Sequence, residues 1–107
     1  MSNEVILCNS SNESVSVFVT AKLDGAKLRV DGVDYGKSPK GFFGGSEYEY
    51  WYTFDEENTD LLFRKIGASK NDPLAELKKR FSGMEGCRNL REYCDAAGIK
   101  YRFESWT

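Results

Sequence analysis

The chain is organised around one aromatic stretch, Tyr48-Glu49-Tyr50-Trp51-Tyr52-Thr53-Phe54. This stretch holds five aromatic residues in seven positions and no glycine or proline, which is typical of a β-strand. Successive side chains of a strand point to opposite faces, so the tyrosines and Phe54 share one face while Glu49, Trp51 and Thr53 share the other. Aromatic residues on both faces predict a central strand, covered on one side and partly covered on the other.

The first part of the chain predicts strands separated by polar turns. The apolar run at residues 4–8 predicts a strand, and the Asn/Ser-rich segment 9–14 predicts a loop. Apolar residues then alternate with other residues along 15–23, which indicates a strand with one buried face.

Two Asp-Gly pairs follow and predict two turns. Asp24-Gly25 precedes a further alternating run at 27–31, and this pattern predicts a hairpin with a type I′ turn, which needs positive φ at both central residues. Asp31-Gly32 predicts a second turn, with a brief strand at 33–35 after it. The Gly-rich segment 36–46 predicts a loop that carries Phe42 and Phe43.

The residues after the aromatic stretch predict three helices. Asp55 and Asp72-Pro73 are start signals for the first two, and the third is expected at about 86–97. Gly67, Gly83 and Gly98 stand where helices end. The residues expected on the inner faces are, in chain order, Thr59, Leu62, Phe63, Ile66, Leu74, Leu77, Phe81, Cys87, Leu90, Cys94 and Ala97.

Apolar residues alternate again from Ile99 to Phe103 and predict a buried last strand that ends near Trp106 and pairs with the aromatic strand. Strands followed by helices predict an α+β fold: an antiparallel sheet of N-terminal hairpin strands plus the aromatic strand, three helices on one face, and a C-terminal strand that returns to the sheet. A length of 107 residues predicts a single domain, 1–107, with one core.

The composition argues against an enzyme. The chain has no histidine, which removes the commonest general base and metal ligand, and its carboxylates are better explained as strand and helix-start residues. We therefore expect no catalytic residue, no metal site and no cofactor. Three cysteines, no signal peptide and no apolar run of about 20 residues predict a cytoplasmic protein that does not enter a membrane.

Charge is distributed unevenly along the chain. Residues 1–57 carry ten acidic and five basic side chains, whereas residues 58–107 carry seven acidic and ten basic side chains, for a net charge of −2. A dipolar surface of this kind suits a charged partner.

The second half of the chain also carries a resemblance. From Glu47 to Trp106 it combines the aromatic strand, an Asp-Glu-Glu-Asn helix start, Gly-terminated helices and the closing stretch Ile-Lys-Tyr-Arg-Phe-Glu-Ser-Trp. This arrangement resembles small bacterial proteins, some of which act as immunity proteins or inhibitors. The resemblance implies a stoichiometric binder of a toxin, or of a host-defence nuclease in the manner of a phage anti-CRISPR protein.

We therefore expect a non-enzymatic protein that binds and blocks a protein partner. Tyr, Trp and Arg dominate the energetics of interfaces, and an acidic surface would suit the basic groove of a nuclease. The residues expected to bind the partner are Phe42, Phe43, Glu47, Glu49, Trp51 and Glu57.

Two alternatives remain at this stage. A nucleic-acid-binding module would use a basic patch made of Lys79, Arg88, Arg91, Lys100 and Arg102, with exposed aromatic rings stacking on bases. The acidic composition of the whole chain weighs against it. Homodimerisation through an exposed edge of the sheet is the other alternative.

Overall fold

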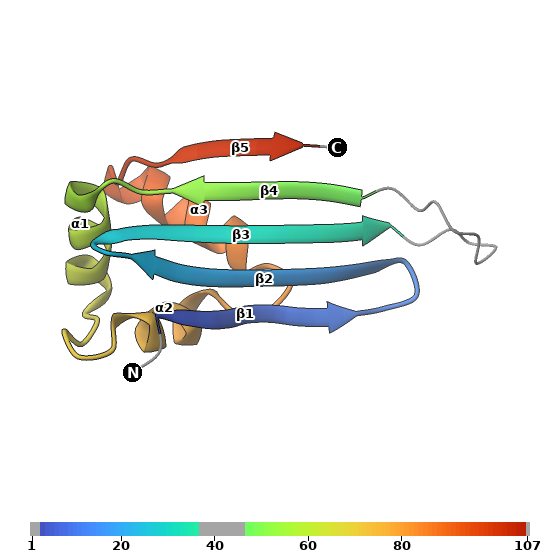
Figure 1. Ribbon diagram of the computed structural model, residues 1–107, viewed down its shortest axis with the longest axis horizontal. Helices are drawn as coiled ribbons and strands as arrows, with labels where there is room; N and C mark the ends of the chain where they lie inside the picture. The colour runs from blue at the N-terminus through green and yellow to red at the C-terminus, as the bar shows by residue number, and fades with distance from the viewer. Residues whose placement is uncertain (1–2, 37–46, 107) are drawn as a thin grey trace.

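Five antiparallel strands form one sheet in which every strand lies beside its neighbours in sequence (Figure 1). They are β1 (Glu4–Ser11), β2 (Val15–Asp24), β3 (Lys27–Gly36), β4 (Glu47–Thr53) and β5 (Arg102–Trp106). Three helices stand between β4 and β5: α1 (Glu56–Ile66), α2 (Pro73–Phe81) and α3 (Gly86–Ala97). This computed structural model describes residues 3–36 and 47–106, and it confirms the predicted α+β fold.

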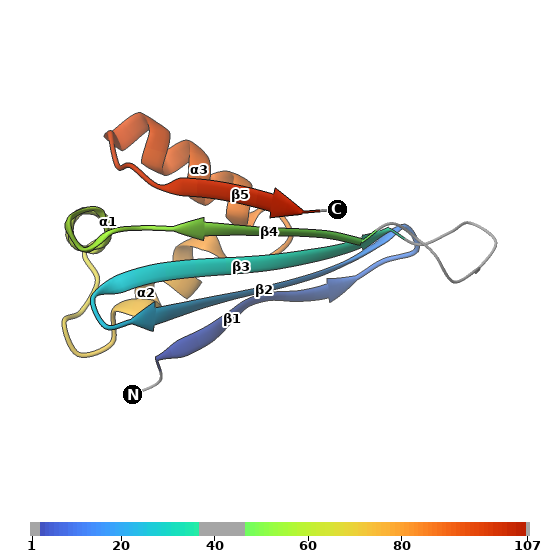
Figure 2. The same ribbon diagram turned by 45° about the horizontal axis from the view of Figure 1, so that its top comes forward.

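The helices cover one face of the sheet and one of its ends. Figures 1 and 2 show α2 and α3 behind the strands, while α1 crosses the end of the sheet at which the β2–β3 turn lies. Among the helices, α2 is the one that packs against β1. The predicted return of the last strand is confirmed, because β5 pairs with β4 and Phe103 lies opposite Tyr52.

One hydrophobic core lies between the sheet and the helices. The alternating apolar residues of β2 and β3 point into it, with Ala21 and Val30 fully buried. From the helices, Leu62, Leu77 and Leu90 are almost completely buried against them. The faces predicted for these apolar patterns are thus the faces that the structure buries.

The tyrosine face of β4 forms a chain of aromatic contacts within this core. Tyr50 and Tyr52 meet edge to face at 6.3 Å between ring centroids, and Tyr52 contacts Phe103 at 5.0 Å. Tyr101 contacts both Tyr52, at 5.7 Å, and Phe54, at 5.8 Å. These rings tie β5 and the segment before it to β4.

The first helix begins and ends as the sequence predicts. The Asp55 carboxylate accepts a hydrogen bond of 2.8 Å from the backbone N–H of Asn58, and Gly67 ends the helix with φ of 71°. The Thr59 hydroxyl, buried beneath the helix, accepts a 3.0 Å hydrogen bond from the N–H of Leu28 and so fixes α1 to the start of β3. The side-chain oxygen of Asn58 accepts a 2.8 Å bond from the N–H of Lys100, which links α1 to the segment that leads into β5.

The hairpin at Asp24 is present, but its turn differs from the predicted one. Asp24 pairs with Lys27, so Gly25 and Ala26 are the two central residues. Of these two residues, Gly25 has a positive φ of 63° and Ala26 does not. A glycine in the first central position is the signature of a type II′ turn, so the type I′ prediction is wrong.

The turn predicted at Asp31-Gly32 is also wrong, because β3 runs through both residues without interruption. Gly32 lies opposite Tyr50 of β4, and the Tyr50 ring lies over it. A Cβ atom at this position would collide with the ring. The glycine is therefore required by a close approach within the sheet and not by a change of chain direction.

The two edge strands of the sheet, β1 and β5, also differ from the prediction. Strand β1 extends to Ser11, so only the last part of the predicted 9–14 loop forms the turn, where the Asn12 side chain accepts bonds from the N–H groups of Ser14 and Val15. Strand β5 begins at Arg102 instead of Ile99, and all of its residues are exposed. The prediction of a buried last strand is wrong because β5 is an edge strand beyond the helical layer.

We expect Gly32→Ala to lower the free energy of unfolding by about 2 kcal/mol, the usual cost of overpacking a closely fitted core. Urea unfolding followed by circular dichroism would measure the change. In a Tyr50→Leu background the same substitution should cost clearly less, because the ring that it collides with is gone. An equal cost in both backgrounds would show that the ring is not the reason for the glycine.

Two tyrosines with raised pKa values, the buried Tyr50 and the partly buried Tyr101, should make the protein sensitive to alkali. Burial raises the pKa of Tyr50 and raises that of Tyr101 to about 12, from an ordinary value of 10.0. The neutral phenols therefore contribute stability that is complete below pH 10 and is lost as the pH rises toward 12.

We expect the urea midpoint to fall between pH 10 and pH 12, with tyrosinate absorbance at 295 nm rising as the protein unfolds. Tyr101→Phe removes one of the raised phenols, so its midpoint should fall less steeply over this interval. Equal slopes for the variant and the wild type would contradict the assignment to Tyr101.

Candidate protein-binding surface

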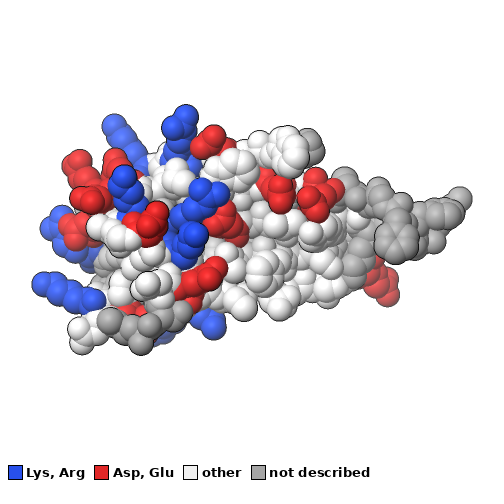
Figure 3. Space-filling model, in the orientation of Figure 1, with Lys and Arg blue, Asp and Glu red and all other residues white. Residues whose placement is uncertain are grey.

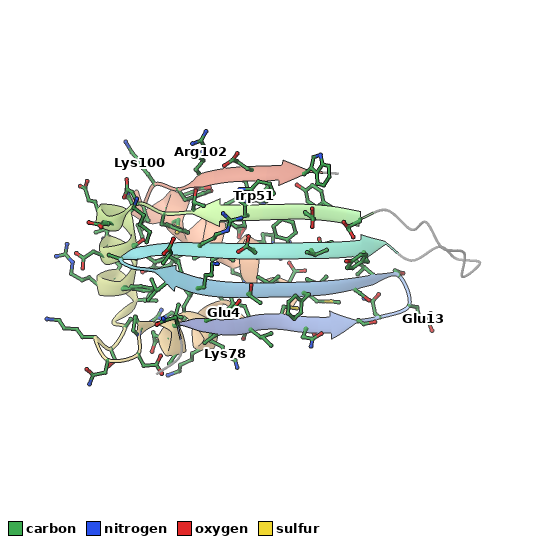
Figure 4. All side chains as sticks on the ribbon, viewed as in Figure 1. Glu4, Glu13, Trp51, Lys78, Lys100 and Arg102 are labelled. Carbon is green, nitrogen blue, oxygen red and sulfur yellow. The ribbon has the colours of Figure 1, made fainter. Side chains whose placement is uncertain are left out.

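The face of the sheet opposite α2 and α3 is not covered by any element that the structure describes, and we call it the open face (Figure 4). Strand register determines which side chains stand next to each other on it. Phe18 pairs with Val33, Val33 with Glu49, and Glu49 with Trp106, so these four residues form a row across β2 to β5.

Large apolar side chains are exposed on the open face. Ile6 is 46% exposed, Phe18 41%, Tyr35 47% and Trp106 68%. The strand register places each of them on the face away from α2 and α3, so their exposure follows from the position of the helices. Clusters of exposed apolar side chains of this kind mark interaction surfaces.

The end of the open face nearest α1 carries charges that pair with each other. Arg29 forms an ion pair of 2.9 Å with Asp31 and also lies over the Trp51 ring, with its guanidinium carbon 5.6 Å from the ring centroid. On β5, Nε of Arg102 lies 3.5 Å from Oε1 of Glu104, which makes a second ion pair. These pairs leave little uncompensated charge around Trp51.

The other end of the open face has a different character. Glu47 and Glu49 have no basic side chain within ion-pair distance among the described residues. The hydrogen bond and charge of Glu47 raise the pKa of Tyr35 beside it. Figure 3 shows this half as largely uncharged, with scattered acidic side chains and no Lys or Arg visible over its described part.

We call this group the aromatic–acidic patch, defined as Phe18, Tyr35, Glu47, Glu49 and Trp106. It combines three exposed aromatic rings from three strands with two carboxylates on a fourth. The strands fix the backbone positions from which these side chains project, so a partner that covers the patch has to order the side chains but not the backbone.

The structure separates the residues that the sequence predicted as partner-binding. Glu47, Glu49 and Trp51 lie on the open face, because they belong to the non-core face of β4. Glu57 lies in the first turn of α1, beyond the opposite end of β4 from Glu47. Phe42 and Phe43 are outside the described residues.

The predicted basic patch is not gathered on one surface. Lys79 belongs to α2, which packs against β1, whereas Lys100 and Arg102 lie at the opposite edge of the sheet, where Figure 4 shows the latter two. Arg88 and Arg91 are exposed on α3, and Arg88 forms a 3.0 Å ion pair with Glu85. The basic side chains are thus distributed between both edges and the helical layer.

The described part of the chain was compared with the geometry that a metal site needs. No group of three His, Cys, Asp or Glu residues there is placed to hold a metal ion. Burial raises the pKa of Cys87 to about 11 and that of Cys94 to about 12, so both are protonated thiols near neutral pH and poor nucleophiles. None of the helices in residues 3–36 and 47–106 has the length and apolar composition needed to span a bilayer.

Comparison of the chain with protein-family models, with curated proteins and with solved structures gave no match.

Sequence patterns alone do not identify Phe18, Tyr35 and Trp106 as one surface. The alternation within each strand is a usable signal for that strand separately. The proximity of the three rings depends on the order and register of β2 to β5, and β3 reaches this register only because it continues through Gly32, where local signals predict a turn.

The two tryptophans should differ in accessibility to solvent. Trp106 is 68% exposed, whereas Trp51 is half-buried under Arg29. We expect acrylamide to quench the fluorescence of Trp51→Phe, which retains Trp106, more strongly than that of Trp106→Phe. Equal quenching in the two variants would show that β5 does not present Trp106 as described.

Proposed function

We propose that this chain is a non-enzymatic, inhibitor-type protein that binds a protein partner through the aromatic–acidic patch and blocks the partner's own ligand site. The observation that supports the proposal is the uncovered face of the sheet, on which three exposed aromatic side chains adjoin two carboxylates without basic neighbours among the described residues. Large aromatic side chains contribute most of the binding energy of such interfaces.

The charge of the patch favours a partner with a basic surface. Glu47 and Glu49 carry negative charge that no described basic side chain compensates, so a cationic groove would supply the missing partners. The nucleic-acid channel of a nuclease is such a groove. An immunity protein against a nuclease toxin and an anti-CRISPR inhibitor would both act by occupying it.

Two further features are compatible with this role. The described cysteines are free thiols, as expected of a protein that acts in the reducing environment of a bacterial cytoplasm. The dispersed arrangement of Lys79, Arg88, Arg91, Lys100 and Arg102 makes binding through nucleic acid the weaker alternative, because binding along a phosphate backbone needs a continuous basic surface.

The experiment begins by capturing partners of the tagged protein from host lysate, with and without nuclease digestion, followed by titration of the captured protein. Phe18→Ser and Glu49→Lys alter the patch at exposed or half-buried positions without touching the core. Each should raise the dissociation constant at least about tenfold, or about 1.4 kcal/mol. Glu49→Lys should also weaken the salt dependence of binding.

Glu92→Lys is the matched control, since it makes the same charge change at an exposed position of α3, in the helical layer. It should bind as the wild type does. Unchanged affinity in both patch variants would show that the patch is not the binding surface. Loss of the captured material after nuclease digestion would favour the nucleic-acid alternative.

A further inference from the structure

The two edges of the sheet are protected to different degrees. At the β1 edge, the register shifts between Ile6 and Cys8, and the carbonyl of Leu7 accepts a 2.9 Å hydrogen bond from the N–H of Gly83. The helix α2 lies against this strand. A bulge and an outside hydrogen bond at the centre of an edge strand prevent another strand from pairing with it.

The β5 edge has no such protection among the described residues. Strand β5 is the last strand of the sheet, its register with β4 is regular, and all five of its residues are exposed. Figure 1 shows it as the upper edge, with no other described element beyond it. Phe103 is 40% exposed on the side of the helices, although most apolar residues on that side are buried.

The sequence of β5 is complementary to itself in the antiparallel direction. Two copies related by a two-fold axis perpendicular to the sheet keep their open faces on the same side. Such an axis lies midway between two directly opposed copies of the same residue, so the register is named by that residue. With the axis at Phe103, the two Phe103 rings face each other and Arg102 of each copy lies opposite Glu104 of the other. An axis one residue away, at Arg102 or Glu104, would instead place like charges opposite each other.

We propose that two copies of this chain pair through β5 in this register, which joins their sheets into one continuous sheet. Arg102 and Glu104 already lie 3.5 Å apart on the open face of one chain. With the second copy, four side chains of alternating charge would form a square on the open face, while the two Phe103 rings would meet on the helix side of the sheet. Cross-strand pairs of opposite charge and of aromatic rings both stabilise antiparallel sheets.

The occupant of this edge is a second copy because of that charge pattern. An unrelated extended peptide would need its own charges in the complementary order, whereas β5 supplies the order itself. Trp106 belongs both to β5 and to the aromatic–acidic patch, but Arg102, Phe103 and Glu104, which carry the pairing, lie outside the patch. The variants that test the pairing therefore differ from those that test the proposed binding function. It would place two aromatic–acidic patches on the same side of one continuous sheet.

The test measures the mass of the full chain by sedimentation equilibrium over a range of concentrations. We expect the wild type to form a dimer. Arg102→Glu gives β5 two acids and Glu104→Arg gives it two bases, so in each variant both cross-copy pairs become repulsive. The dimer dissociation constant of each variant alone should rise at least about tenfold.

An equimolar mixture of the two variants decides the register. The glutamate introduced in the first variant would then lie opposite the arginine introduced in the second, and the native Glu104 of the first opposite the native Arg102 of the second. The mixture should therefore form a heterodimer although neither variant self-associates. Arg64→Glu is the matched control, because it makes the same substitution in another exposed ion pair, with Asp60, on α1. It should leave the dimer unchanged, and circular dichroism should show that all variants fold.

Three outcomes would overturn the proposal. A wild-type chain that stays monomeric at every concentration would exclude the pairing. Single variants that dimerise as well as the wild type would exclude the β5 edge. A mixture that remains monomeric, when the wild type dimerises and the single variants do not, would exclude the register centred on Phe103.

Discussion

The packing of β4 between β3 and β5 is the constraint on which the rest of the structure depends. On one side of this strand, the Tyr50 ring occupies the space left by Gly32. On its other side, Tyr52 contacts both Phe103 and Tyr101. The same strand contributes buried rings to the core and, at alternate positions, acidic and aromatic side chains to the open face. A single seven-residue strand therefore joins the sheet, the helical layer and the candidate surface.

The open face follows from the order of the elements along the chain. The first four strands form a meander with short connections or the segment 37–46 between them, so no described helix crosses behind or in front of the sheet until β4 is complete. The three helices then share one connection, from β4 to β5. Because α2 and α3 cover one face and α1 covers an end, the second face has no described element left to cover it.

The sequence predicted the parts of this fold that depend on local signals. Asp55, Gly67 and Gly98 marked helix ends correctly, since caps are determined by one or two residues. The turn predicted at Asp31-Gly32 was wrong because an Asp-Gly pair occurs both in turns and in strands. The reason for the glycine here is the Tyr50 ring of the next strand, which local sequence does not reveal. The candidate surface was predicted only in part, again because its composition depends on contacts between strands. Glu49 was predicted from the alternation within β4, but its neighbours Val33 and Trp106 come from other strands.

The position of β5 after the helices has a consequence for how the chain folds. Strands β1 and β2, and β2 and β3, meet across tight hairpins, whereas β4 and β5 meet only after the chain has closed a loop through all three helices, from Thr53 to Arg102. Loop closure costs entropy before the contacts are made, so the hairpins are expected to form early and β5 to dock late. A strand that docks late in one molecule is also the element that a nascent neighbour can most readily exchange.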